Sequence, residues 1–320
     1  MARATKTVTR EKRSARTASA APRRLKASKY KSFHLSKHIK HAHALPNVWK
    51  IAKQAAHLLW QYKKVVIGIT LLYGVLNLIL VRGFSGGTDV SSLKSDLDLL
   101  FGGNWAHLSS SLTVFALLVT SAGNTTSSTG GVYQFLLVII VSLAIIWTFR
   151  QVLAGGKARV RDGFYRGLTP LVPFILVLLV IGLQLLPLLI GSSLYSTVIN
   201  NGIAVYAAEK FLWGLLFFLL ALLSLYMISS SVFALYIVTL PDMTPMKALR
   251  SARELVRFRR WAILRKVLFL PLLLLIVAAV IMVPIITFAT PAAQWVFFLL
   301  TMFALIAVHA YMYTLYRELL

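Results

Sequence analysis

The chain has 320 residues, of which 58% are apolar and 13% are charged. A soluble domain is usually about 45–50% apolar and about 25% charged, so the composition excludes an ordinary water-soluble protein. The 34 Lys and Arg residues outnumber 9 Asp and Glu, and this net charge of +25 first suggests membrane orientation and contact with anionic lipid. Because the sequence has no cysteine, disulfides, thiolate nucleophiles and cysteine-ligated metals are excluded.

The first 45 residues are rich in Lys, Arg, Ala, Ser and Thr, with Glu11 as their only acid. Because they carry few bulky apolar side chains, they cannot offset the entropy of ordering, and we predict a disordered cytoplasmic tail over residues 1–45. The histidines of this tail lie among lysines, which repel a cation, and lack the order of a structural metal site. They are His34, His38, His41 and His43. We therefore predict no bound metal and no cofactor.

Residues 46–63 (PNVWKIAKQAAHLLWQYK) combine apolar and basic positions at helical spacing. Pro46 and Asn47 are typical of a helix start, and lysines supply the polar side. We predict an amphipathic helix that lies on the inner membrane interface before the first span. Its predicted apolar side comprises Val48, Ala52, Ala55, Leu59 and Tyr62.

Six apolar runs follow, each roughly long enough for a hydrocarbon core of about 30 Å. They are Val65–Val81, Val132–Leu153, Leu168–Ile190, Phe211–Leu240, Val267–Ala289 and Ala292–Tyr316. The outer loop 83–131 contains a further apolar stretch, Leu112–Val119, which is too short to span and predicts an interfacial or re-entrant helix. The predicted fold class is therefore all-α, a polytopic membrane protein with six transmembrane helices.

The basic residues predict the orientation. Every Lys and Arg lies on one side of these spans except Arg82, Lys94 and Lys210. By the positive-inside rule both termini are then cytoplasmic, which requires an even number of spans, and six satisfies that requirement.

One unit recurs three times within the predicted transmembrane domain 46–320: a basic amphipathic segment, a span outward and a span back. The copies lie near residues 46–153, 157–240 and 244–317. Units of the same sense predict a parallel array of three hairpins, which differs from the inverted repeats of many transporters.

The third copy has the sharpest pattern. Thr244 is predicted to cap its first helix, with Pro245 at the first helical position. A turn of 100° per residue places an apolar arc on one side, made of Ala248, Ala252, Leu255 and Val256. Beside it lies a basic face that we predict to bind lipid headgroups, each arginine being worth about 1 kcal/mol near an anionic surface. These arginines are Arg250, Arg253, Arg257 and Arg260.

The stretch PMKALRSARELVRFRRWAIL, which enters an apolar span, and its weaker echoes at 48–64 and 157–168 resemble a bacterial group of six-span membrane proteins. The group includes the YciC-like inner-membrane proteins and the membrane domain attached to some glycerophosphodiester phosphodiesterases. The resemblance covers roughly residues 46–317 and implies a multi-pass protein of the inner cell membrane. It carries over no catalytic residue. The chain departs from the group in its long basic tail, and no attached phosphodiesterase domain is expected in it.

His309 is the one ionisable residue well inside a predicted span. It is either an intramembrane polar site or a hydrogen-bonded packing residue. In the outer loop, Asp89, Asp96 and Asp98 either bind a hard cation or form a solvated acidic patch. We expect no enzymatic activity, because no acid–base pair lies at a common depth.

Three functions are compatible with these sequence patterns. The first is a non-enzymatic integral membrane protein with a structural, scaffolding or lipid-interacting role, whose partners are anionic membrane lipids and an unidentified protein. The second is a transporter or permease subunit for a lipid or an apolar solute. The third is a membrane tether whose basic tail binds nucleic acid or ribosomes through sequence-independent phosphate contacts.

Overall fold

The computed structural model describes residues 46–82, 93–96, 106–121, 128–156 and 158–320, and the predicted tail lies outside them. Within those ranges the regular structure is helical and contains no strand. Six helices there are long and apolar enough to cross a membrane. The predicted fold class, an all-α multi-pass membrane protein with six spans, is therefore confirmed.

The spanning segments begin with α3 (Lys63–Asn77), which continues into the π-helical turn η1 (Leu78–Arg82). The others are α6 (Ser128–Leu153), α8 (Leu171–Asn200), α9 (Ala207–Ser231), α12 (Arg260–Phe288) and α13 (Thr290–Leu319). A short helix, α10 (Ala234–Ile237), follows α9.

Several helices run past the limits of their apolar runs. Helix α8 reaches Asn200 rather than Ile190, because its polar residues find partners one turn away: Ser192 Oγ donates to Leu189 O at 2.9 Å. Helix α9 ends at Ser231, and the span continues through the short helix α10 to Ile237. Hydropathy therefore locates the spans but not their ends.

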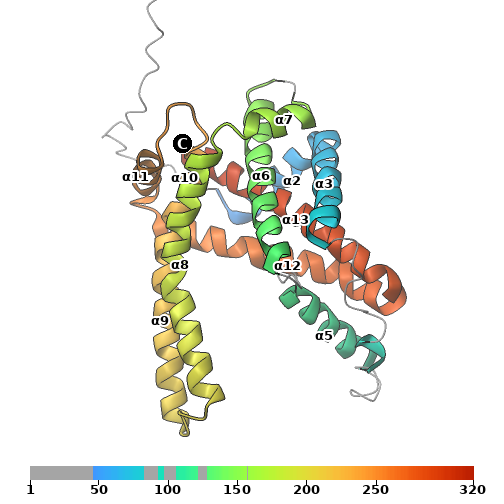
Figure 1. Cartoon of the computed structure of the whole chain (residues 1–320), viewed down its shortest axis with the longest axis vertical. Coiled ribbons are helices and arrows are strands. Elements are labelled where there is room, and N and C mark those ends of the chain that lie inside the picture. Colours follow the sequence, from blue (N-terminus) through green and yellow to red (C-terminus); the bar gives the residue numbers. More distant parts are fainter. Residues whose placement is uncertain (1–45, 83–92, 97–105, 122–127, 157) are drawn as a thin grey trace, which may run out of the picture. The chain divides into compact units, whose positions relative to one another are not determined.

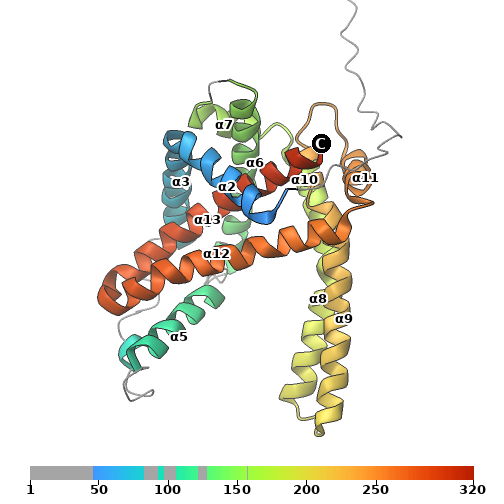
Figure 2. The same cartoon turned by 180° about the vertical axis from the view of Figure 1, so that it is seen from behind.

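Three shorter helices precede the first, third and fifth of these spans: α2 (Val48–Gln61), α7 (Val160–Gly167) and α11 (Pro245–Val256). We call them the basic helices. The start of α11 is as predicted, with Pro245 first and the Thr244 hydroxyl accepting from Lys247 N at 3.4 Å. All lie toward the same end of the drawing as the C-terminus (Figures 1 and 2).

Helix α2 packs its apolar side against α13. The fully buried positions are Ile51, Ala55 and Leu58, whereas the predicted Val48 and Leu59 are only half-buried. The buried stripe is rotated from the predicted one because a single neighbouring helix, rather than a flat interface, selects which residues are covered.

Helix α7 approaches α6 very closely, and glycine makes this approach feasible. A Cβ on Gly163 would lie 2.7 Å from Thr148 Oγ1, and one on Gly167 would lie 3.1 Å from the Ala144 Cα. Both glycines are buried against α6.

The main core surrounds α13, which contacts α2, α3, α6 and α12. Its C-terminal half is buried on several sides, at residues that include Ile306, Ala310 and Leu315. Contributions from α6 include Leu143 and Ile145. A smaller core joins α12 to α5 (Ala106–Ser121), a helix in the predicted outer-loop position.

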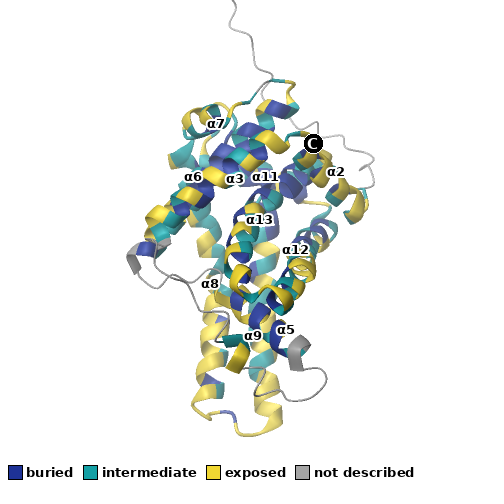
Figure 3. Ribbon diagram, turned by 90° about the vertical axis from the view of Figure 1, so that its right-hand side faces the viewer, coloured by how far each residue is buried: buried dark blue, intermediate teal, exposed yellow. Residues whose placement is uncertain are grey.

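Helices α8 and α9 lie side by side along their length (Figures 1 and 2). Their outward surfaces carry exposed apolar side chains. Figure 3 shows this exposure for the lower part of the pair. Near Pro187 of α8, the Leu188 N–H donates to Ser224 Oγ of α9 at 3.0 Å, which joins the two helices inside an apolar surface. Helix α12 crosses this pair obliquely (Figure 2).

The α6–α7 contact generates the first prediction. Replacing Gly163 with Leu should lower the thermal unfolding midpoint in detergent, because overpacking of a tight contact costs about 1–3 kcal/mol. Gly182→Leu on α8 is the matched control, since nothing lies within 4 Å of a Cβ placed there. Equal midpoints for the two variants would contradict the close packing of α7 on α6.

Candidate functional site

The predicted apolar arc of α11 faces the protein. Ala248, Ala252 and Val256 are fully buried where α11 packs on α9 and α10, and Leu255 is half-buried. Arg250 and Arg253 point away from that contact and are exposed. This arrangement leaves their guanidinium groups free to reach groups outside the bundle.

Arg260 differs from its predicted place. Helix α11 ends at Val256, Arg257 follows as its C-cap, and Arg260 is the first residue of α12. A turn of 100° per residue places residues on one face only within a continuous helix. Arg260 therefore does not share a helix face with Arg250 and Arg253. Its guanidinium lies 4.7 Å from the centre of the Tyr226 ring, a cation–π contact to α9. Headgroup binding by these four residues stays a prediction.

The other basic helices repeat the arrangement of α11. Lys50 and Lys53 are exposed on α2, beside its buried contact with α13. Arg161 and Arg166 are exposed on α7, whose glycines face α6. Each basic helix thus turns its cations outward and its small or apolar residues toward the bundle.

Large aromatic side chains accompany these cations. Trp49 and Trp60 of α2 are exposed, as are Phe258 and Trp261 beside Arg257 and Arg260. The Lys63 ammonium lies 5.2 Å from the centre of the Trp60 ring. Exposed Trp next to Lys and Arg is typical of the headgroup level of a membrane.

A groove of about 620 Å³ lies between α2 and the end of α13, with Leu153 of α6 at its wall. Its basic side chains are Lys50, Lys53 and Arg317, and Glu318 is its one carboxylate. The amide of Gln54 bridges the groove, with Nε2 donating to Glu318 Oε1 at 3.3 Å. This groove was not predicted from the sequence. One side of α2 is nevertheless marked as polar by the helical spacing of its residues 50, 53, 54, 57 and 61.

His309 is buried and has a partner on each side of its ring. Tyr236 OH of α10 lies 3.0 Å from Nδ1, and Ser142 Oγ of α6 lies 2.9 Å from Nε2. One ring nitrogen donates and the other accepts, in either tautomer. Of the two interpretations of His309, hydrogen-bonded packing is the one that this geometry favours.

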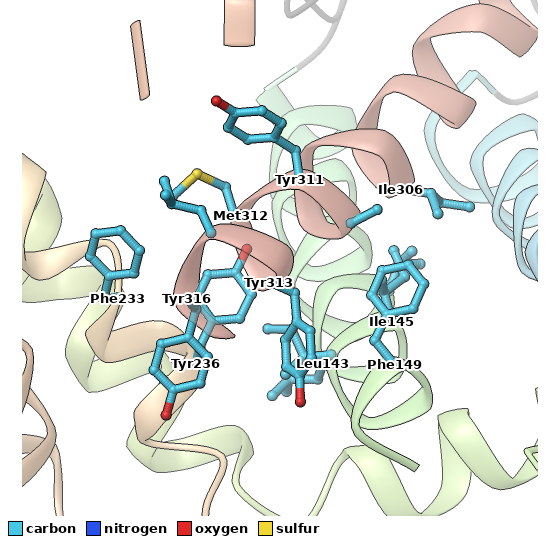
Figure 4. Packing of buried hydrophobic residues seen from close by; sticks show 14 of the residues in the cluster. Leu143, Ile145, Phe149, Phe233, Tyr236, Ile306, Tyr311, Met312, Tyr313 and Tyr316 are labelled. Carbon is cyan, nitrogen blue, oxygen red and sulfur yellow. The ribbon is translucent and has the colours of Figure 1, made fainter. Parts of the chain in front are cut away.

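Aromatic rings from α6, α10 and α13 form a cluster that includes Tyr236, the partner of His309 (Figure 4). Tyr236 stacks on Tyr316 with ring centres 6.1 Å apart and also contacts Tyr313. Arg150 at the end of α6 donates from Nη1 to Thr239 O at 2.7 Å, which fixes the chain just after α10. The residues that partner His309 could not be found from sequence, because they lie far from it along the chain.

The buried side chain of Lys266 ties α12 to the chain just before α2. Lys266 donates from Nζ to Pro46 O, directly before α2, and its own carbonyl accepts from Tyr311 OH at 3.0 Å. A buried ammonium needs such partners because an unpaired charge in an apolar environment is costly.

Of the predicted acidic cluster, Asp96 is described, whereas Asp89 and Asp98 lie outside the described residues. In the described ranges, no three His, Asp or Glu side chains come together as a metal site. Neighbouring Lys94 instead binds the end of α12, donating to Ile286 O at 2.8 Å and Thr287 O at 3.0 Å.

The His309 triad generates the second prediction. Tyr236→Phe should lower the thermal unfolding midpoint, because it leaves a buried ring nitrogen without its partner, at a cost of about 1–3 kcal/mol. Tyr316→Phe is the control, since that ring stacks in the same cluster and no hydrogen bond of its hydroxyl occurs among the described residues. A Tyr236→Phe midpoint equal to that of Tyr316→Phe would contradict a structural role for the triad.

Comparison of the chain with protein-family models, with curated proteins and with solved structures gives no match.

Proposed function

We propose that this protein is a non-enzymatic, multi-pass protein of the inner cell membrane that binds anionic lipid headgroups on its cytoplasmic side. The observation that carries the proposal is the shared arrangement of the basic helices α2, α7 and α11. In each, the exposed surface is basic and the opposite surface packs on the bundle. The resemblance to the YciC-like group agrees with the proposed location.

The orientation follows from charge. The exposed cations of α2, α7 and α11 precede spans that leave the same side of the membrane in a six-span chain. The positive-inside rule assigns that side to the cytoplasm, together with both termini. The cytoplasmic leaflet is also the one with a negative surface potential, so orientation and lipid attraction have the same electrostatic cause.

The burial pattern specifies how such lipids are held. An interfacial amphipathic helix binds a membrane by inserting its apolar face among the acyl chains. In the basic helices, residues such as Ile51, Ala252 and Val256 are already buried in protein. Their contribution to lipid binding is therefore electrostatic, with exposed aromatic rings such as Phe258 setting the depth. Binding of this kind weakens as ionic strength rises.

The third prediction tests this mechanism on α11. In nanodiscs that contain phosphatidylglycerol and phosphatidylcholine, the triple variant Arg250→Gln, Arg253→Gln and Arg257→Gln should retain less phosphatidylglycerol than the unchanged protein. Each cation near the surface contributes about 1 kcal/mol, or roughly fivefold in affinity. Native mass spectrometry of the lipids released from the protein measures the change.

Glu254→Gln is the matched control, because it introduces the same residue on the same helix and removes a negative charge from an exposed position. It should leave phosphatidylglycerol retention unchanged or raise it. Unchanged retention in the triple variant, at 50 mM and at 500 mM salt alike, would contradict electrostatic binding by α11.

A further inference from the structure

The groove between α2 and α13 is built from two polar stripes that face each other. On α2, Lys50 lies three and four residues before Lys53 and Gln54, and His57 lies three and four residues after them, so the four share one side of that helix. On α13, Thr314, Arg317 and Glu318 have the same spacing in its last turns. The stripes meet because the adjacent side of α2, at Ile51, Ala55 and Leu58, is buried where α2 packs on α13.

The charge of this groove favours an anion. Three permanent cations, Lys50, Lys53 and Arg317, line it together with the single carboxylate of Glu318. Arginine and lysine together are the usual ligands of phosphate oxygens, with the guanidinium able to bind two of them at once. A volume of about 620 Å³ lies within the range of small-molecule sites, about 300–1,000 Å³.

One atom of the groove lacks a partner. Gln54 uses Nε2 to donate to Glu318, whereas its Oε1 is buried and accepts no hydrogen bond from the described part of the chain. A buried acceptor without a donor costs about 1–3 kcal/mol. A ligand that brings a hydroxyl or amine hydrogen to Gln54 Oε1 would remove that cost, once the amide turns this oxygen toward the groove.

We propose that this groove binds a phosphate ester that carries a neighbouring hydroxyl, the chemistry of a glycerol phosphate headgroup. The phosphate oxygens accept from Lys50, Lys53 and Arg317, and the hydroxyl donates to Gln54 Oε1. With Glu318 present, the three cations leave a net charge of +2, which attracts the singly charged diester of a phospholipid. The inference rests on the proposed function and adds to it one defined site, separate from the exposed arginines of α11.

The source of the phosphate is either a membrane lipid or a soluble ester, and two arms of one experiment separate them. In the lipid arm, the full chain is placed in nanodiscs of phosphatidylglycerol and phosphatidylcholine, and retained lipid is measured by native mass spectrometry. In the soluble arm, nanodiscs of phosphatidylcholine alone are titrated with glycerol 3-phosphate by calorimetry.

The variants are Arg317→Gln, which removes a cation, and Glu318→Gln, which removes the carboxylate one residue away. We expect at least a several-fold loss of binding for Arg317→Gln and a several-fold gain for Glu318→Gln. Opposite shifts cannot come from misfolding, and the thermal midpoint checks each variant. Shifts in the lipid arm identify the lipid source, and shifts in the soluble arm alone identify the soluble ester.

Equal binding by both variants and the unchanged protein in both arms would overturn the inference. Tighter binding by Arg317→Gln together with weaker binding by Glu318→Gln would also overturn it, because that pattern would indicate a cationic ligand. The α11 triple variant separates this failure from that of the proposed function. If the α11 variant loses phosphatidylglycerol while Arg317→Gln does not, the proposed function stands and the groove is not its site. If neither variant loses phosphatidylglycerol, both the proposed function and the groove site are contradicted.

Discussion

Burial of the C-terminal half of α13 is the constraint on which the rest of the structure depends. From Ile306 to Tyr316 this helix is covered on several sides, at residues as different as Ala310, Tyr311 and Leu315. Helices α2, α3, α6 and α12 surround it. His309 is at the centre of the same stretch, so the covering helices also have to supply hydrogen-bond partners.

This packing decides the chemistry of the basic helices. Because α2 covers α13 with Ile51 and Leu58, that apolar surface is no longer available to a membrane. Because the polar residues of α2 occupy the neighbouring side of the helix, they come to face the last turns of α13 and form the groove. One packing contact thus has two consequences: the apolar stripe of α2 is covered by protein, and the cations of α2 are gathered beside Glu318.

The sequence predicted the features that depend on local chemistry. Six spans follow from hydropathy alone, since a hydrocarbon core requires long apolar helices. The start of α11 follows from Thr244 and Pro245, and its buried arc from the spacing of Ala248, Ala252 and Val256. Each of these predictions rests on residues within a few turns of one another.

Features set by distant residues could not be predicted in the same way. The buried stripe of α2 depends on which helix covers it, and that helix is α13, far along the chain. The Tyr236–His309 pair joins residues 73 positions apart. The groove of Lys53 and Arg317 likewise needs the two ends of the domain to meet. Arg260 was assigned to α11 because nothing in the composition marks the break after Val256.

Lipid binding as proposed requires α2, α7 and α11 to lie at the same face of the membrane, the cytoplasmic one. The absence of cysteine from the sequence makes a direct test simple. Single cysteines placed at the exposed positions Lys53, Arg161 and Met246, and at Asn201 in the turn after α8, can be labelled with a membrane-impermeant maleimide. In right-side-out vesicles we expect labelling at position 201 alone. In inverted vesicles we expect labelling at positions 53, 161 and 246. Labelling of any two basic helices from opposite sides would contradict it.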